Sequence, residues 1–308
     1  MRFNTSLLHA GVQKEANGST LPPVYQTSAF EQTSATDLEK IFENKAPGFC
    51  YTRVGNPTVT AFENRITKLE GGIASIACAS GMAALMNAFL NILRSGNEIV
   101  SSASLYGGTI DLFTDLEAFG ITTRYVENNN WEQIEGAINE HTRLVFAETI
   151  GNPCLDVTDI EKLAEIAHAH ELLLIVDNTT STPYLIQVLK HGADIVVNSS
   201  SKYINGSSNS ISGVLTDGGK FKWKKEKYPG LADYLKFGPM AFIAKLRNGL
   251  FRNTGACLAP VNAYLNVIGL ETLGLRMERQ CNNAAALAKW IEETYPDVTV
   301  NYPGLESS

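Results

Sequence analysis

The stretch that decides the fold is ADIVVNSSSK, residues 193–202. Its first half is a short apolar run typical of a buried strand, and Lys202 follows among hydroxyl side chains. A lysine at the carboxyl end of a strand can form a Schiff base with an aldehyde cofactor, and nearby hydroxyls can bond to a phosphate. Taken alone, however, a lysine after a strand is more often a surface residue.

Similar apolar runs alternate with helical patterns along much of the chain. Further strands are expected at 73–78, 98–101, 122–126, 144–147 and 172–176, and helices at 58–69, 81–93, 160–169 and 184–190. This alternation is typical of an α/β fold with a mainly parallel sheet that helices cover on both faces. In such sheets, ligands bind beyond the carboxyl ends of the strands.

A carboxylate stands at one of these ends. Asp177 directly follows the run 172–176, and the spacing to Lys202 leaves room for one helix and one strand, so both groups can face one cavity. A pyridoxal cofactor needs an anion against its ring nitrogen, because the protonated ring is the electron sink. A cap on the next turn explains Asp177 equally well.

Two further turns carry candidate binding groups. Between the strand at 73–78 and the following helix, Gly81 and Met82 offer free backbone N–H groups that suit a phosphate, although a simple tight turn is the alternative. Tyr106 follows another strand, where an aromatic ring can stack on a cofactor. By itself Tyr106 is more often structural, but the four elements together, in this order, favour a pyridoxal-5′-phosphate (PLP) site.

Composition limits the other classes of function. The net charge of -7 argues against nucleic acid as the main partner, because phosphate backbones call for a basic face. Five widely spaced cysteines without a Cys-x-x-Cys pair argue against a disulfide framework and a zinc site. No apolar stretch is long enough to span a bilayer. We therefore expect a soluble, cytoplasmic protein without a metal or membrane partner.

The chain divides into three expected parts. Residues 1–57, rich in Thr, Ser, Pro and Asn, are expected to form an irregular arm that packs on something else. Residues 58–252 form the cofactor-binding domain, and 253–308 the start of a C-terminal domain that we expect to continue beyond Ser308. After residue 238 helices are expected at 241–251 and 261–290, and 298–302 is expected to be a first strand.

These motifs, in their order, resemble the Cys/Met-metabolism PLP-dependent enzymes, which have fold type I. The resemblance runs from LHAG at residues 8–11 to the last residue. It implies a seven-stranded, mainly parallel sheet and an incomplete C-terminal α/β domain. It also implies PLP as cofactor, an amino-acid substrate with sulfide or a thiol, and a homotetramer built of dimers that share active sites.

The resemblance also implies roles for single residues. Lys202 matches the Schiff-base lysine, Asp177 the partner of the pyridine nitrogen, and Asn152 an asparagine near the cofactor's 3-hydroxyl. Tyr106 matches the stacking ring and can assist the leaving group as a general acid. The groups that match phosphate ligands are Gly81, Met82, Ser199 and Ser201, together with Tyr51 and Arg53, which match residues that reach the phosphate of a neighbouring subunit.

Within the family, the segments 218–221, 237–239, 244–245 and 255–258 resemble O-acetylhomoserine sulfhydrylases, which replace the acetate of O-acetylhomoserine with sulfide to give homocysteine. Methionine γ-lyases usually have a Cys two residues beyond the stacking Tyr, where this chain has Gly108. A lyase of the methionine γ-lyase or cystathionine β/γ-lyase type, and a catalytically incomplete PLP-binding fragment, remain as alternatives.

The chain departs from the family pattern in three places. Asn198 stands where the family has a His, and residues 205–207 read Asn-Gly-Ser where the family has Gly-Gly-His. The arginine that grips the substrate's α-carboxylate has no counterpart that we can place before Ser308, so we expect it beyond that residue.

Overall fold

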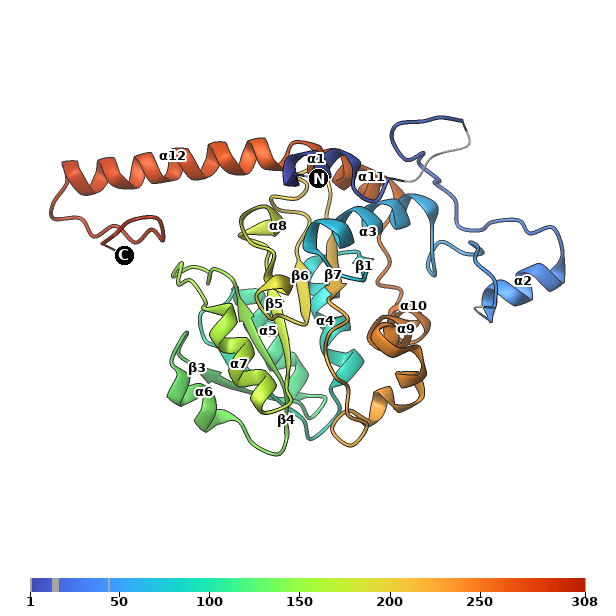
Figure 1. Cartoon of the computed structure of the whole chain (residues 1–308), viewed down its shortest axis with the longest axis horizontal. Coiled ribbons are helices and arrows are strands. Elements are labelled where there is room, and N and C mark those ends of the chain that lie inside the picture. The colour runs from blue at the N-terminus through green and yellow to red at the C-terminus, as the bar shows by residue number, and fades with distance from the viewer. Residues whose placement is uncertain (1, 13–16, 44, 308) are drawn as a thin grey trace.

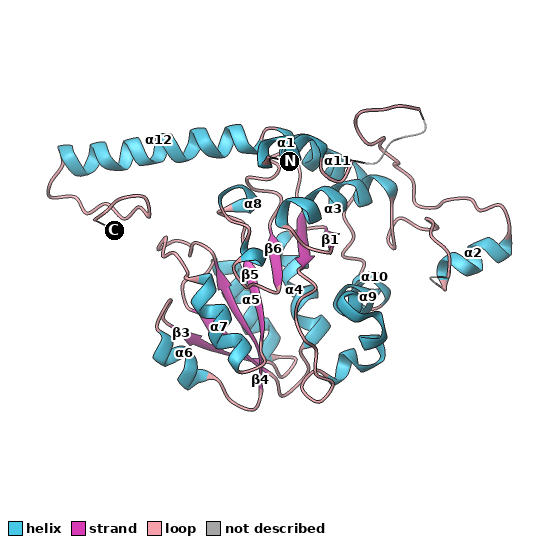
Figure 2. Ribbon diagram, viewed as in Figure 1, coloured by secondary structure: helices cyan, strands magenta, loops and turns pink. Residues whose placement is uncertain are grey.

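A seven-stranded sheet forms the centre of the molecule (Figures 1 and 2). The structure is a computed structural model that describes residues 2–12, 17–43 and 45–307. The strands are β1 (Ala74–Cys78), β2 (Glu98–Ser102), β3 (Thr122–Val126), β4 (Thr142–Glu148), β5 (Leu173–Asp177), β6 (Ile195–Asn198) and β7 (Gly213–Asp217). Their order is β1-β7-β6-β5-β4-β2-β3.

The sheet is mainly parallel, which confirms the expected α/β architecture. The neighbouring strands from β3 through β2, β4 and β5 to β6 all pair in parallel. In contrast, β7 runs antiparallel to both β6 and β1. The central strands are almost wholly buried, which is why they read as unbroken apolar runs. The strand β7 was not predicted, because it follows a stretch of Ser, Asn and Gly without a helical pattern before it.

Helices cover both faces of this sheet. The helices of the described residues, including those that lie away from the sheet, are α1 (Phe3–His9), α2 (Ala35–Phe42), α3 (Pro57–Glu70), α4 (Gly81–Ile92), α5 (Gly107–Glu117), α6 (Trp131–Ala137), α7 (Ile160–Ala169), α8 (Thr182–Leu185), α9 (Ala241–Asn248), α10 (Leu250–Thr254), α11 (Pro260–Glu271) and α12 (Leu273–Thr294), with 3-10 helices η1 (Val188–Lys190) and η2 (Pro229–Met240).

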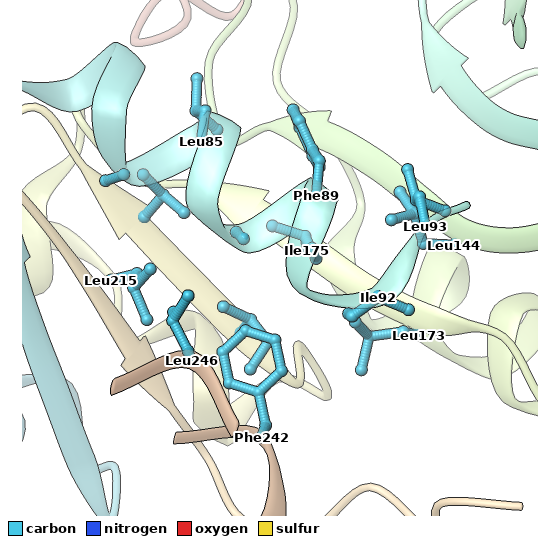
Figure 3. Packing of buried hydrophobic residues seen from close by; sticks show 14 of the residues in the cluster. Leu85, Phe89, Ile92, Leu93, Leu144, Leu173, Ile175, Leu215, Phe242 and Leu246 are labelled. Carbon is cyan, nitrogen blue, oxygen red and sulfur yellow. The ribbon is translucent and has the colours of Figure 1, made fainter. Parts of the chain in front are cut away.

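The main core lies between the sheet and the helices α4, α5 and α9. Figure 3 shows the α4 side chains of Leu85, Phe89 and Ile92 packed with Ile175 of β5 and Phe242 of α9. A second core lies under α6 and α7, and a third joins α1, α3, α11 and α12 to the β1–β7 edge. These cores fix the carboxyl ends of the parallel strands relative to one another.

Caps in the sequence fix where the two helices nearest the strand ends begin. At α3, Asn56 accepts a hydrogen bond from the N–H of Thr58 at 2.9 Å, and Pro57 occupies the first turn. At α4, the Ser80 hydroxyl accepts from the N–H of Ala83 at 3.0 Å. The start of α4 at Gly81 was predicted, and it matters because this helix end faces the strand ends.

Four local predictions differ from the structure. The helix expected at 241–251 is two helices, α9 and α10, because Gly249 between them is not helical. Residues 184–190 form two short helices, α8 and η1, because Ile186 has extended backbone between them. The helix expected at 261–290 is two helices that meet at Thr272. The strand expected at 298–302 is wrong: these residues are irregular and are paired with no strand in the described part of the chain.

The expected arm is not wholly irregular, since it contains α1 and α2. Helix α1 packs on the body through Leu7, whereas the segment around α2 extends away from it (Figure 1). Helix α12 extends from the opposite side of the body. The domain boundaries at 57 and 252 stay a prediction. Within the described residues, no helix combines the length and the apolar character that crossing a membrane requires.

Candidate active site

Lys202 lies in the turn directly after β6, with an exposed side chain. Its backbone N–H donates to the carbonyl of Ser199 at 3.1 Å, and its own carbonyl accepts from Gly206 at 2.8 Å. Beneath the turn, the fully buried Ser200 hydroxyl donates to the hydroxyl of Ser212 at 2.8 Å. The turn is thus anchored from below while the lysine faces outward.

The start of α4 lies against this turn. A Cβ atom built on Gly81 would be only 2.7 Å from the Cβ of Ser199, and one on Gly213 would be 2.2 Å from the carbonyl oxygen of Ser80. Only glycine allows this approach. As a result, the backbone N–H groups of Gly81 and Met82, at the positive end of a twelve-residue helix, lie beside the Ser199 hydroxyl. A phosphate fits the chemistry of such a cradle.

The second predicted hydroxyl, that of Ser201, is engaged with the chain before β7. Ser201 Oγ donates to the carbonyl of Ser212 at 3.0 Å and accepts from the Ser212 N–H at 2.8 Å. To donate to a phosphate it would have to turn away from that carbonyl. Ser199 therefore makes the simpler phosphate ligand of the two.

Asp177 ends β5, beside Glu148 of β4 and Val197 of β6. Its Oδ1 accepts from the N–H of Thr179 at 2.9 Å, and the Thr179 hydroxyl in turn accepts from the N–H of Ser199 at 2.7 Å. Burial raises the pKa of Asp177 above its usual range, and the bonds from Thr179 oppose this. A protonated ring nitrogen placed against this carboxyl group would favour its anionic form.

Thr179 was missed by the sequence reasoning, although it links the carboxylate to the lysine turn. Part of the signal was present, because an Asp side chain commonly accepts a hydrogen bond from the backbone N–H two residues further on. Reading Asp177 together with Thr179, rather than alone, would have found this link.

Glu148 was missed as well. It is 7% exposed, pairs with Asp177 across the sheet, and accepts a hydrogen bond from the N–H of Tyr106 at 2.7 Å through Oε1. Burial, and then the charge of Asp177, raise the pKa of Glu148 to about 8. Glu148 therefore holds its proton more tightly than an exposed carboxyl group does.

Tyr106 precedes α5 and is half exposed. Its ring lies over Gly108, where a Cβ atom would be 2.5 Å from Cε1 of the ring. The absence of a side chain at residue 108 is therefore what leaves room for this ring position. Asn152 is exposed in the loop that follows β4, four residues beyond Glu148.

Tyr51 and Arg53 lie elsewhere. The Arg53 guanidinium is 5.3 Å from the centre of the Tyr51 ring and donates to the carbonyl of Arg252 in α10. Among the described residues, neither side chain has a hydrogen bond to the turn of Lys202 or to the start of α4. Their expected service to a neighbouring subunit stays a prediction.

The sequence profile of the Cys/Met metabolism PLP-dependent enzymes matches residues 4–308. The chain belongs to this family. The homocysteine synthase of Schizosaccharomyces pombe is 41% identical to it over 321 residues, which cover 99% of this chain and 75% of that protein. The O-acetyl-L-homoserine sulfhydrylase of Corynebacterium glutamicum is also 41% identical, with 99% and 74% covered. The L-methionine gamma-lyase of Fusobacterium nucleatum is 39% identical, with 99% and 73% covered.

Solved structures of this PLP-dependent family share the fold. A crystal structure of a putative O-acetylhomoserine (thiol)-lyase from Campylobacter jejuni, which contains a pyridoxyl-lysine phosphate, matches with a TM-score of 0.92. It is 32% identical and covers all of this chain, which covers 79% of that one. The protein is thus a fold type I PLP enzyme. The Gly81 cradle, the outward Lys202 and the partly buried Asp177 fit this cofactor.

Proposed function

We propose that this PLP-dependent enzyme replaces the acetate of O-acetyl-L-homoserine with sulfide and so forms L-homocysteine. The observation that carries the proposal is the meeting of Lys202, the Gly81 cradle and Asp177 at one edge of the sheet, in a chain about 40% identical to homocysteine synthases and O-acetylhomoserine sulfhydrylases. Sulfide and the amino acid are its two small-molecule partners.

The bound cofactor supplies an electron sink for the substrate's α-carbon. Gly81, Met82 and Ser199 would hold the phosphate, with Ser201 as a further donor. Asp177 would be the partner of the ring nitrogen, and Asn152 that of the 3-hydroxyl. The raised pKa of Glu148 leaves Asp177 as the carboxyl group that would oppose the ring.

Lys202 Nζ would hold the cofactor and would then be the base that accepts and returns the protons of the substrate's α- and β-carbons. Its side chain is exposed and unhindered at the end of an anchored turn, which suits a group that must swing between positions. The Tyr106 ring would stack on the cofactor, and its hydroxyl would donate a proton to the departing acetate.

Elimination, as in a methionine γ-lyase, is the second candidate. It has the support of the relative from Fusobacterium nucleatum. Against it stands Gly108, because a side chain at this position would meet the Tyr106 ring at 2.5 Å. A Cys at position 108 would therefore force the Tyr106 ring, and with it the hydroxyl, into another position.

The deciding experiment supplies O-acetyl-L-homoserine and sulfide to the holoenzyme and quantifies homocysteine, acetate, ammonia and 2-oxo acid. Homocysteine and acetate in equal amounts, absent with Lys202→Ala, support replacement. Ammonia and a 2-oxo acid without homocysteine would show elimination instead. A protein that binds PLP yet yields no product from any sulfur amino acid would show a catalytically incomplete chain.

We also propose that the enzyme is a homo-oligomer whose subunits share active sites, and that it works in the cytoplasm. A groove between α2 and η2, with Phe42, Phe237 and Met240 exposed in its lining, offers apolar surface for another copy. If Tyr51 and Arg53 serve a neighbour's phosphate, Arg53→Ala should release PLP more readily, and mixing it with Lys202→Ala should restore some activity. Mixtures no more active than the two variants alone would contradict shared sites.

A further inference from the structure

Glu70, the last residue of α3, is fully buried behind the strand ends that carry the site. Its Oε1 accepts a hydrogen bond from the side-chain amide of Asn198 at 2.7 Å. The Asn178 side chain also interacts with it. Asn198 directly precedes Ser199, and Asn178 directly follows Asp177. Glu70 therefore touches the chain next to the phosphate cradle and next to the partner of the ring nitrogen.

No positive charge compensates this buried carboxyl group. The titratable groups on the surrounding elements include Lys68 on its own helix, Asp177 on β5, Lys190 on η1 and Asp217 on β7, yet no charged side chain of the described residues shifts it. The two groups that reach it are neutral amides. An ionised carboxylate here would be an isolated charge in an apolar interior, which is strongly unfavourable.

The hydrogen bonds around Glu70 are consistent with a bound proton. Three buried oxygen atoms lack a partner: Glu70 Oε2, Asn178 Oδ1 and Asn198 Oδ1. All three are acceptors, so a proton on Oε2 gives the cluster the donor that it lacks. Burial raises the pKa of Glu70 to about 8, which leaves the proton in place at neutral pH. The hydrogen bonds from Asn198 and Asn178 oppose this rise, but as neutral amides they bring no positive charge that would cancel it.

We propose that Glu70 acts as a neutral carboxylic acid that positions the ends of β5 and β6, and that its ionisation at alkaline pH loosens the grip on the cofactor. Glu70 touches neither the cofactor nor the substrate, so it is a positioning residue acting through Asn178 and Asn198. The inference concerns cofactor binding and does not depend on which sulfur amino acid the enzyme converts.

The test compares Glu70→Gln with the wild type in PLP titrations of the apoprotein, followed by absorbance, between pH 7 and 9.5. Glutamine has the shape of the neutral acid and cannot ionise. If only the neutral form binds, a pKa of about 8 predicts that wild-type affinity falls ~30-fold over this range, relative to Glu70→Gln. Taking the ratio of the two proteins cancels the titration of Lys202 and of the cofactor itself.

Glu63→Gln is the matched control, because Glu63 lies on the same helix and is 6% exposed, yet it pairs with Arg247 at 2.9 Å. Removing that charge should lower the melting temperature at every pH, whereas Glu70→Gln should keep it at pH 7 and raise it at pH 9.5. A wild type and Glu70→Gln whose affinities change in parallel, within threefold, would overturn the proposal. So would a Glu70→Gln protein that fails to fold or releases PLP at pH 7. If PLP affinity depends on pH as expected but no homocysteine is formed, only the proposed reaction is contradicted and the role of Glu70 stands.

Discussion

The stability of Asp217→Asn relative to the wild type should be higher at pH 8 than at pH 5. Asp217 ends β7 and pairs with Ile195 at the start of β6, so it lies at the edge of the sheet opposite Lys202. It is 3% exposed, its Oδ1 accepts from the N–H of Gly219 at 2.7 Å, and its Oδ2 has no partner. Burial, and then the neighbouring Asp194, raise the pKa of Asp217 from 3.8 to about 7.

The sign and size follow from proton linkage. Because the folded protein holds this proton more tightly than the unfolded chain, stability is fully present below pH ~4 and is lost as pH rises to about 7. With pKa values of 3.8 unfolded and about 7 folded, the loss between pH 5 and pH 8 is about 2.5 kcal/mol. Asparagine keeps the acceptor for Gly219 and removes the titration. Its amide hydrogens cost a pH-independent amount on the order of 1–3 kcal/mol if they find no partner.

The assay is urea unfolding of the apoprotein at pH 5 and pH 8, followed by circular dichroism. The difference in unfolding free energy between Asp217→Asn and the wild type should increase by about 2.5 kcal/mol from the lower to the higher pH. Asp233→Asn, at an exposed position, is the control and should show no such change. If the Asp217→Asn difference is the same at both pH values, the carboxyl group is already ionised in the folded protein and the reasoning fails.

Three further predictions concern the site. Gly81→Ala should weaken PLP binding at least tenfold, because its Cβ would lie 2.7 Å from the Cβ of Ser199. Gly136→Ala, with open space around it, is the control and should leave the PLP titration unchanged. Equal PLP affinities of the two variants would contradict the phosphate-binding role of the cradle. Lys202→Ala should lose the visible absorbance band of the bound cofactor, and mass spectrometry after borohydride should find no lysine adduct; an adduct elsewhere would identify a different lysine. Gly108→Cys should displace the Tyr106 ring, weaken its stacking on PLP and lower kcat for homocysteine formation. An unchanged kcat would show that the ring position has no role.

Short apolar runs followed by polar residues were enough to predict most of the sheet and the part of the site at its edge. Lys202, Asp177 and Gly81 each come directly after a strand or at the start of a helix, so local sequence fixes both their placement and their exposure. Parallel strands bring such positions together because all of their carboxyl ends meet at one edge. The residues found in this way are those whose role depends on a single turn.

The missed residues depend on which strands are neighbours. Glu148 matters because β4 lies beside β5, which places it against Asp177, and the expected strand had stopped one residue earlier at 147. Strand order is decided by the packing of whole helices and cannot be read from one run. The opposite error occurred at 298–302, where β-branched residues favoured a strand although a strand requires a hydrogen-bonding partner as well.

The pairing of β1 with β7 affects how the protein folds during its synthesis on the ribosome. Cys78 pairs with Gly213, so the first strand to be synthesised waits, with an unpaired edge, until almost the whole sheet has been translated. Gly213 also lies against Ser80 and Gly81. A nascent chain in which Lys202 is already exposed therefore still lacks Gly213 beside the phosphate cradle. Binding of PLP thus becomes one of the last steps in the maturation of the protein.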